Sequence, residues 1–249
     1  MQDCLIIIPT YNEKENIGKI IPFTLALSER FHILVVEDGS PDGTADVVKS
    51  LMQQYPGRVH ILERKGKLGL GTAYIAGFRW ALERTYQFIF EMDADFSHNP
   101  NDLMRLLEAC EKQGGQLSIG SRYVKGGGVE NWPWDRLFLS SFASKYVRII
   151  TGMPVSDTTA GFVCYRRETL QGIDLNKIKF VGYTFQVEMK FAAWLNGFRI
   201  IEVPIIFKDR EVGVSKMSGK IIKEAVTGVI KIKWRSLLDN SAYRVKQIA

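Results

Sequence analysis

The sequence predicts an α/β protein with a doubly wound, mainly parallel sheet, and two observations support this prediction. Short apolar, β-branched runs alternate with segments of helical period and length through the first half of the chain. Polar or charged clusters follow four of these runs, as expected where ligands bind at the carboxyl ends of parallel strands. The length of 249 residues and the hydrophobic content of 46% are those of an ordinary globular protein.

The elements follow in chain order. Buried strands are expected at residues 5–8, 33–36, 59–62, 88–90 and 117–119, with helices between them at 15–28, 44–54, 71–84 and 101–113. Three glycines at 126–128 and the Trp-Pro-Trp run at 132–134 then indicate loops. The remaining elements are a helix at 136–150, a strand at 161–166, a helix at 184–195, a strand at 200–207 and a helix from 220 onward. We expect one domain over residues 1–249, with halves at 1–122 and 123–235 and a tail at 236–249.

The net charge of +6 is localised. Residues 205–249 hold 10 Lys+Arg and 4 Asp+Glu, so the rest of the chain is balanced. This distribution argues against a nucleic-acid partner and favours a local anionic one. Three widely spaced cysteines, Cys4, Cys110 and Cys164, predict buried thiols in a reducing compartment. Without a signal peptide or an apolar run of ~18 residues, we expect a cytoplasmic protein that touches a membrane at most peripherally.

The clusters at the predicted strand ends suggest a cation and a nucleotide. Asp93 and Asp95 are two residues apart, so both carboxylates can face one hard cation, Mg²⁺ or Mn²⁺. Asp38 can accept from the N–H groups of a base, whereas Asp42 and Thr44 suit a turn and helix cap. The glycine-rich segment 66–72 favours a phosphate loop and a simple tight turn about equally, and it is neither a dinucleotide fingerprint nor a Walker A sequence.

Two helices have amphipathic patterns. On the helix at 136–150 the apolar residues, from Phe138 to Ile150, share one face. The helix from 220 has one broad apolar face and carries Lys220, Lys223 and Lys231 opposite, and Lys233 interrupts the stripe, so fraying is expected there. Such helices suit a lipid interface or an ordinary core equally well. His32, His60 and His98 have no nucleophile elbow around them, and we expect structural or surface roles.

These residues resemble a known family. The segments PTYNEKENI, VVEDGSPDGTADVV, GLGTAYIAGFRWAL, MDADFSHNP, GSRYVKGGGVENW, SDTTAGFVCYRRETL, YTFQVEMKFAAW and EVPIIFKDREVGVSKMSG occur in order over residues 5–235. Together they resemble the dolichol-phosphate (polyprenol-phosphate) mannosyltransferases, inverting GT-A-fold enzymes of glycosyltransferase family 2. The first and fourth segments are shared with many family 2 enzymes, and the last four are more specific to the polyprenyl-phosphate group.

The resemblance implies a role for each matching residue. Asp93 and Asp95 would hold Mg²⁺ or Mn²⁺ on the diphosphate of the donor, and Asp95 and Arg122 would be catalytic. Arg122, Arg136 and Ser140 would receive the lipid phosphate. The implied nucleotide contacts, which include two basic residues that close over the phosphates, are Pro9, Tyr11, Glu13, Asp38, Asp93, Arg210 and Lys216.

The implied reaction is inverting, metal-dependent transfer of mannose from GDP-mannose to dolichyl or another polyprenyl phosphate at the cytosolic face of a membrane. A phosphate monoester has its second pKa near ~6, so it needs cations more than a general base. Two positions depart from many relatives: Glu37 precedes Asp38 where an aspartate is common, and Ser97 replaces a possible third metal ligand. A family 2 transferase with another donor, such as UDP-glucose, and a non-catalytic membrane-binding module are the alternatives.

Overall fold

The computed structural model describes residues 3–209, 219–239 and 241–245, and a seven-stranded sheet runs through this part of the chain in the order β3-β2-β1-β4-β7-β5-β8. β7 is antiparallel to both of its neighbours, β4 and β5, whereas the other pairs are parallel. The strands are β1 (Cys4–Thr10), β2 (Phe31–Glu37), β3 (Val59–Glu63), β4 (Phe88–Glu91), β5 (Leu117–Ser121), β7 (Val163–Arg166) and β8 (Ile200–Pro204). The predicted fold class is confirmed.

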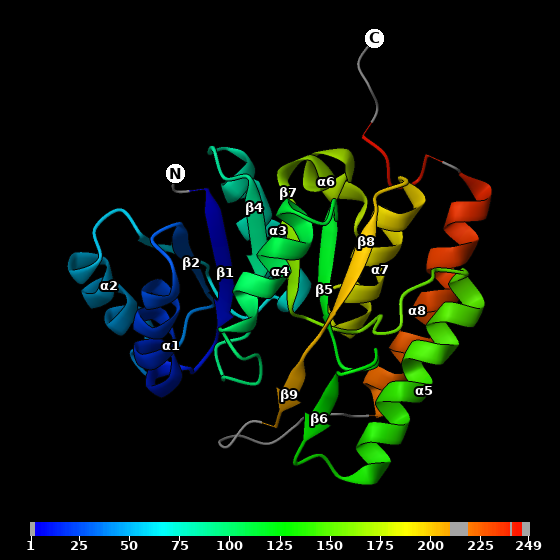
Figure 1. The fold of residues 1–249 in the computed structure, drawn as a ribbon, viewed down its shortest axis with the longest axis horizontal. Helices are drawn as coiled ribbons and strands as arrows, with labels where there is room; N and C mark the ends of the chain where they lie inside the picture. The colour runs from blue at the N-terminus through cyan, green and yellow to red at the C-terminus, as the bar shows by residue number, and fades with distance from the viewer. Residues whose placement is uncertain (1–2, 210–218, 240, 246–249) are drawn as a thin grey trace.

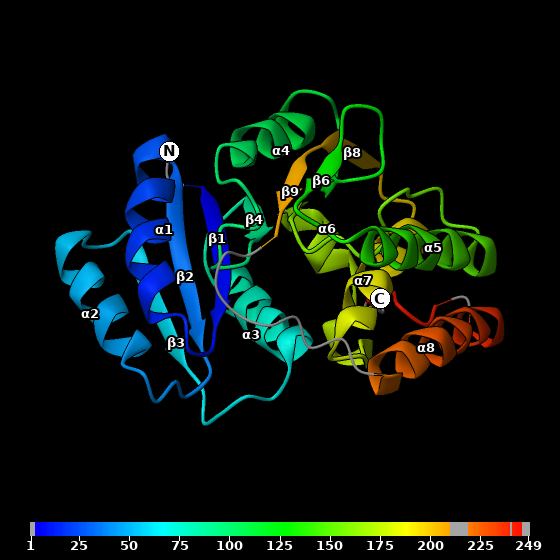
Figure 2. The same ribbon diagram turned by 90° about the horizontal axis from the view of Figure 1, so that it is seen from below.

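Helices cover both faces of the sheet. One face is covered by α1 (Lys14–Leu27), α2 (Thr44–Gln54) and α4 (Asp102–Glu111), the other by α3 (Leu70–Leu82), α6 (Arg167–Gly172) and α7 (Tyr183–Leu195) (Figure 2). A short 3₁₀ turn, Leu175–Lys177, precedes α7. α5 (Trp134–Thr151) and α8 (Gly219–Leu238) lie side by side beyond β8 (Figure 1).

The strands are apolar without alternation because both faces of the sheet are covered. Along β1, Leu5 and Ile7 pack into the core beneath α3 and α7, while Ile6 and Ile8 pack into the core beneath α1 and α4. The three cysteines are buried and unpaired, as predicted. The buried strand residues therefore form the scaffold, and the residues that can contact a ligand lie at the strand ends.

The strand expected at 200–207 is two strands in two sheets, so that prediction was wrong. β8 ends at Pro204, and β9 (Ile206–Lys208) instead pairs in parallel with β6 (Gly128–Glu130). Pro204 has no N–H, which suits the end of a sheet strand, and the N–H of Ile205 turns back to the carbonyl of Ser121 at 3.0 Å. This two-stranded ribbon brings residues 128–130 and 206–208 together below the main sheet (Figure 1).

α8 does not fray at Lys233, contrary to the prediction, and it runs on to Leu238. Lys233 Nζ donates to the carbonyl of Thr151, the last residue of α5, at 3.1 Å. A cation at a helix carboxyl end is favourable, so this lysine fits within the apolar stripe. Tyr146 Oη donates to the carbonyl of Val226 at 3.0 Å, and the two bonds hold α5 and α8 parallel to each other.

The apolar residues of α5 do not share one environment, which corrects the single-face interpretation. Val147 is buried with Ser144 against the body of the protein, whereas Phe138 is 66% and Ile149 80% exposed. Among the described residues, neither α5, α8 nor any other helix combines the length and apolarity that a bilayer crossing needs. The described apolar residues of the two helices that are at least 43% exposed, called here the outer apolar surface, are Trp134, Phe138, Phe142, Ile149, Val226, Ile230, Trp234, Leu237 and Leu238.

Candidate active site

The predicted site residues gather along one edge of the sheet. β1, β2, β4 and β5 run in the same direction, so their carboxyl ends meet at the lower edge in Figure 1. Tyr11 follows β1, Asp38 follows β2, Asp93 follows β4 by two residues, and Arg122 follows β5. The four strand ends therefore lie at one edge of the sheet, as the sequence predicted, and the role of their residues stays a prediction.

Asp38 is held by a residue that the sequence analysis did not single out. Arg64, one residue after β3, donates Nε and Nη2 to the two oxygens of Asp38 at 2.6 and 2.7 Å. The pair is nearly buried, with 11% and 8% of the side chains exposed. A carboxylate engaged on both oxygens by an arginine fork has outer lone pairs left, which suit a single ring N–H of guanine or of uracil.

Glu37 stabilises the turn after β2. Its carboxylate accepts from the backbone N–H groups of Gly39 and Ser40 at 2.9 and 2.7 Å. Gly39 has a φ of 72°, a conformation that favours glycine. Asp42 accepts from the N–H and hydroxyl of Thr44, which confirms the predicted turn role of that segment.

The loop after β1 is tied to the loop after β2. The N–H of Asn12 donates to Ser40 Oγ at 3.0 Å, and the N–H of Glu13 donates to Thr44 Oγ1 at 3.1 Å. Tyr11 is partly exposed, and Lys67 Nζ lies 4.7 Å from its ring centroid. Pro9 lies within β1, while Arg210 and Lys216 lie outside the described residues.

The glycine-rich segment 66–72 packs as a turn against α7. The N–H of Gly71 donates to the carbonyl of Val181 at 2.8 Å, so this donor of the first turn of α3 is already engaged. A Cβ on Gly71 would lie 2.8 Å from the Phe185 ring and from the Phe180 carbonyl oxygen. The glycine is required for close packing, and this favours the tight-turn interpretation of the segment.

The acidic pair lies beside a buried histidine. The N–H of Asp93 donates to His98 Nδ1 at 3.2 Å, and one oxygen of Asp95 accepts from the N–H of Ser97 at 3.0 Å. His98 stacks on Phe162 with ring centroids 4.9 Å apart. Burial lowers the pKa of His98 to about 4, with Asp95 opposing the shift, so the imidazole is neutral at neutral pH. His98 therefore lies inside the protein and supports the loop that carries Asp93 and Asp95.

The residues present fit a divalent cation bound with a substrate. Two carboxylates, with 41% of the Asp93 side chain exposed, offer hard oxygen donors toward the strand-end edge. Within the described part of the chain no third His, Cys, Asp or Glu joins them in a metal-binding group. Mg²⁺ and Mn²⁺ sites of this type complete their shells with phosphates and water. Ser97 is buried, and its backbone N–H donates to the carboxylate of Asp95.

Arg122 is fixed by a buried carboxylate. Its Nε and Nη2 donate to the two oxygens of Asp157 at 2.7 and 2.6 Å, and Nη2 also donates to Thr159 Oγ1 at 3.0 Å. Asp157 is fully buried, and burial alone would raise the pKa of its carboxyl group. The charge and hydrogen bonds of Arg122 outweigh this effect, so the pKa of Asp157 is lowered. Glu202 accepts from the N–H groups of Ser156 and Asp157 and holds this loop in turn.

Arg136 and Ser140 face Arg122 from α5. Arg136 pairs with Asp209 at 2.7 Å, and Ser140 accepts from Tyr123 Oη at 2.7 Å. The guanidinium carbons of Arg136 and Arg122 lie 4.2 and 5.5 Å from the ring centroid of Trp132. Arg122 and Arg136 are therefore brought together around one indole ring, and Ser140 is bonded to Tyr123, the residue next to Arg122.

A chain of ring contacts connects the acidic pair with these arginines. His98, bonded to Asp93, lies 5.5 Å from the ring of Phe207 on β9, and the Arg122 guanidinium lies 5.6 Å from the same ring. Phe207 in turn meets Trp132 at 5.4 Å. The acidic pair and the two arginines are thus linked by a row of neighbouring side chains, with Phe207 of β9 between them.

Five residues of this site were missed as functional candidates: Arg64, Trp132, Asp157, Phe207 and Asp209. The sequence pattern predicts only a loop at Trp132, and it assigns no role to Asp157 in the segment SDTTAGFVCYRRETL. A carboxylate next to threonines and a glycine signals a polar turn, but the partner lies 35 residues away. That pairing follows from the topology and not from local pattern.

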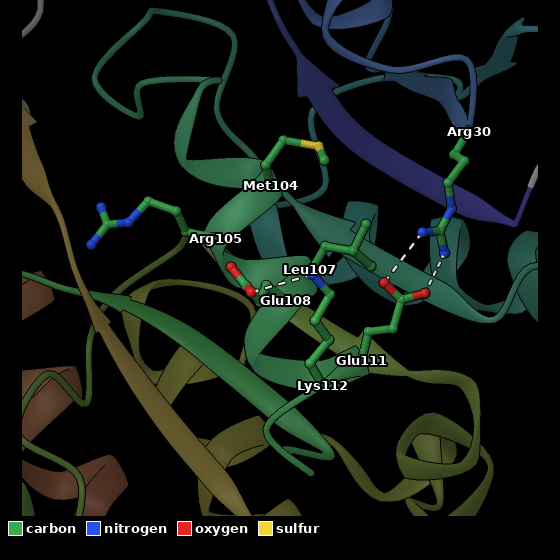
Figure 3. A pocket seen from close by; sticks show the side chains of 7 residues that line it. All are labelled: Arg30, Met104, Arg105, Leu107, Glu108, Glu111 and Lys112. Atoms are coloured by element: carbon green, nitrogen blue, oxygen red, sulfur yellow. Dashed lines mark hydrogen bonds and ion pairs between the residues drawn. The ribbon is translucent and has the colours of Figure 1, made fainter.

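A pocket elsewhere on the molecule has no connection with this edge. It lies between α4 and Arg30, which directly precedes β2, and an Arg30–Glu111 ion pair of 2.9 Å crosses it (Figure 3). Its lining residues are Arg30, Met104, Arg105, Leu107, Glu108, Glu111 and Lys112. Charges of both signs pair with each other there, so the pocket offers no site for a charged ligand.

Comparison with known proteins agrees with this geometry. The family model "Glycosyl transferase family 2" matches residues 5–173. The polyprenol monophosphomannose synthase of Mycolicibacterium smegmatis is 50% identical over 240 residues, covering 96% of this chain and 90% of its own. The undecaprenyl-phosphate mannosyltransferase of Micrococcus luteus is 49% identical over 242 residues, covering 94% and 96%.

A solved structure supports the fold. Glucosyl-3-phosphoglycerate synthase from Mycobacterium tuberculosis, in complex with Mn²⁺, UDP-glucose and phosphoglyceric acid, superposes with a TM-score of 0.66 at 14% identity, covering 94% of this chain and 80% of that one. At this identity the similarity shows the shared GT-A architecture alone. The family model spans more than half of the chain and the relatives span nearly all of it. The chain therefore belongs to glycosyltransferase family 2, and it is an enzyme that resembles the polyprenyl-phosphate mannosyltransferases.

Proposed function

We propose that this enzyme transfers mannose from GDP-mannose to dolichyl or another polyprenyl phosphate, with inversion, and depends on Mg²⁺ or Mn²⁺. The observation that supports it most is the joining of an acidic pair and two arginines in one site through His98, Phe207 and Trp132. Such a site suits a reaction in which two phosphate-bearing substrates meet. The names of the two relatives at about half identity, polyprenol monophosphomannose synthase and undecaprenyl-phosphate mannosyltransferase, support the mannose and the polyprenyl phosphate of this proposal.

In the proposed reaction, an oxygen of the lipid phosphate attacks the anomeric carbon of mannose. The bond from that carbon to the β-phosphate oxygen breaks, and GDP leaves with the electron pair. The incoming phosphate is largely dianionic at neutral pH, so no proton needs to be removed from it. Attack from the face opposite the leaving group inverts the configuration at the anomeric carbon.

Each group of the site has a proposed part in this chemistry. Asp93 and Asp95 would hold a divalent cation, which neutralises charge on the leaving diphosphate when bound. Tyr11, Glu13 and Asp38, with Pro9 beside them, would contact the nucleoside, while Arg210 and Lys216 lie outside the described residues. The acceptor phosphate would lie against Arg122, Arg136 and Ser140.

The two arginines differ in how readily they can turn to a phosphate. The Arg136–Asp209 pair has about a quarter of each side chain exposed, and partly exposed pairs contribute only ~0–1 kcal/mol. Opening this pair therefore costs little. Arg122 stays on buried Asp157, whose pairing would cost several kcal/mol to break, and so it provides a fixed cation.

The outer apolar surface suits contact with a membrane from the cytosolic side. Trp134 and Trp234 are 81% and 62% exposed, and exposed apolar patches of this kind mark interaction sites. Exposed Lys145, Arg148 and Lys231 flank them and suit anionic headgroups, whereas the side chains of Lys220 and Lys223 lie outside the described residues. A peripheral position would bring α5, which carries Arg136 and Ser140, to the lipid phosphate.

A transfer assay tests the proposed activity. The protein is incubated with Mg²⁺, dolichyl phosphate and either GDP-mannose or UDP-glucose, and the lipid product is identified by mass spectrometry. We expect lipid-linked mannose, absent when EDTA is added. Lipid-linked glucose without lipid-linked mannose would instead assign UDP-glucose as the donor. Asp38 does not decide between the two donors, because its carboxylate suits a ring N–H of either guanine or uracil.

Liposome flotation tests the proposed membrane contact. Ile149→Glu and Trp234→Glu place charges in the outer apolar surface and should each reduce the bound fraction several-fold. Met104→Glu is the matched control, since Met104 is 43% exposed on α4 beside the pocket of Figure 3. Equal binding by all four proteins would contradict a role for this surface.

A further inference from the structure

The indole ring of Trp132 contacts both arginines that are proposed to bind the acceptor phosphate. Trp132 precedes Pro133 and α5, and its indole ring packs edge-on against Phe207 of β9 at 5.4 Å. Arg136 and Arg122 contact the same ring, with their guanidinium carbons 4.2 and 5.5 Å from its centroid. Two like charges would otherwise repel each other, and an aromatic face attracts both.

The indole N–H of Trp132 has no acceptor among the residues that the structure describes. Nε1 is buried and makes no hydrogen bond within the described part of the chain. Buried N–H groups are nearly always paired, and an indole nitrogen can act only as a donor. The arginines beside it are donors too, so the missing partner must be an acceptor, and the flanking positive charges favour an anionic one.

We propose that Trp132 is a further acceptor-binding residue, whose ring holds Arg122 and Arg136 side by side and whose Nε1–H donates to the phosphate of the lipid acceptor. This inference rests on the proposed function for the identity of the phosphate. A phosphate monoester supplies acceptor oxygens, whereas indole and guanidinium groups carry only donors. Trp132 thereby joins Ser140 and the arginines as a direct contact of the acceptor.

Substitutions separate the two parts of this role. Trp132→Phe keeps an aromatic face but loses the donor, and we expect the KM for geranyl phosphate, a short soluble acceptor, to rise about tenfold, with kcat and the KM for GDP-mannose nearly unchanged. Trp132→Leu removes the ring face as well and should also lower kcat. The matched control is Trp80→Phe, because Trp80 carries Arg84 at 3.6 Å in a similar stack away from the strand-end edge. A loss of folding alone would lower the active fraction without moving the acceptor KM.

An NMR titration of the wild-type protein tests the hydrogen bond without any variant. The ¹⁵N–¹H indole signal of Trp132, assigned by triple resonance, is followed while geranyl phosphate, inorganic phosphate or GDP with Mg²⁺ is added. We expect a downfield proton shift with geranyl phosphate, a weaker one with inorganic phosphate, and none with GDP.

The outcomes distinguish this inference from the proposed function. A shift with geranyl phosphate in a protein that transfers no mannose supports the Trp132 contact and overturns the activity. No shift with geranyl phosphate, or a shift with GDP alone, overturns the Trp132 contact whatever the activity. A Trp132→Phe enzyme with the acceptor KM of Trp80→Phe likewise overturns it.

Discussion

At the scale of single residues, Arg122 and Arg136 show how burial decides what an ion pair contributes. Arg122 and its partner Asp157 are 9% and 0% exposed, whereas Arg136 and Asp209 are 23% and 26% exposed. Removing one charge of a buried pair leaves the other uncompensated in a medium of low dielectric. Removing one charge of a partly exposed pair leaves the other in contact with water, so the cost is smaller.

The two pairs therefore predict different stability effects. Asp157→Asn should lower the free energy of unfolding by ~3–5 kcal/mol, because Arg122 loses a charged partner in the interior. Asp209→Asn is the matched substitution and should cost no more than ~1 kcal/mol. Urea denaturation followed by circular dichroism measures both, and equal midpoints would contradict the assignment of Arg122 as the fixed cation.

Asp95 allows a direct test of the metal side. Asp95→Asn keeps an oxygen that can accept from the N–H of Ser97 but removes the charge, so transfer should fall by ~10²–10³-fold while the melting temperature stays close to that of the wild type. Asp95→Ala should abolish transfer and leave the fold intact. Asp46→Asn, an exposed acid on α2, is the control. Retained activity in both Asp95 variants would remove the proposed metal role.

Sequence pattern predicted which residues lie at the strand ends, and it missed the residues that hold them. Arg122 directly follows a buried strand, and Asp93 and Asp95 follow another within four residues, so their position alone made them candidates. Arg64 and Asp157 are recognisable only once the sheet order is known, because they lie 26 and 35 residues from the side chains that they bind. Long-range pairing of this kind has no local signature.

At the scale of elements, the amino ends of β2 and β3 and helix α3 enclose two histidines. His32 Nδ1 bonds Tyr86 Oη at 2.8 Å, and His60 lies 5.0 Å from the ring of Trp80. Burial lowers the pKa of His32 to about 4, helped by His60 and Arg58, and burial with nearby Arg84 also lowers the pKa of His60. Both rings are therefore structural, as expected from the sequence.

These shifts predict a loss of stability in mild acid. An unfolded histidine protonates near pH 6.5, whereas His32 in the folded protein protonates only near pH 4, so the unfolded chain binds more protons between these values. The stabilisation is complete above pH 6.5 and is lost as the pH falls toward about 4. Urea midpoints at several pH values measure this dependence, and His32→Gln should make it shallower, while His60 and His98, whose pKa values burial also lowers, retain part of it. The same slope in the variant would show that other groups are responsible.

The elements were predicted better than their connections. All five strands of the first half appear within a few residues of their predicted positions, because a strand in a sheet that is covered on both faces is a short apolar run with clear ends. The division of 200–207 into β8 and β9 was missed, since both pieces have the same apolar pattern and only their partners differ. α8 continues past Lys233 because this lysine bonds the carboxyl end of α5. The sequence of α8 alone gives no sign of that contact.

At the scale of the whole molecule, a buried polar network joins the first half of the chain to the second. Gln186 on α7 hydrogen-bonds Glu91 at the end of β4, and Tyr165 on β7 donates to the same carboxylate at 3.0 Å. Lys190, fully buried, donates to the carbonyls of Ala160 and Gln186 and to the side-chain oxygen of Gln186. Ala160 belongs to the loop that carries Asp157, so this network supports both sides of the site.

The charges of the network compensate each other, and this predicts coupling between them. Burial raises the pKa of Glu91 to about 7 and lowers that of Lys190 to about 8, while each opposes the shift of the other.

Lys190→Met should cost ~3–5 kcal/mol of unfolding free energy, because it leaves carbonyl groups unpaired and Glu91 without its counter-charge. In the double variant Lys190→Met/Glu91→Gln the second substitution removes the charge that the first left alone. The double variant should therefore lose less than the sum of the single losses, by ~1–3 kcal/mol in urea denaturation. Additive losses would mean that the two halves are joined by packing alone.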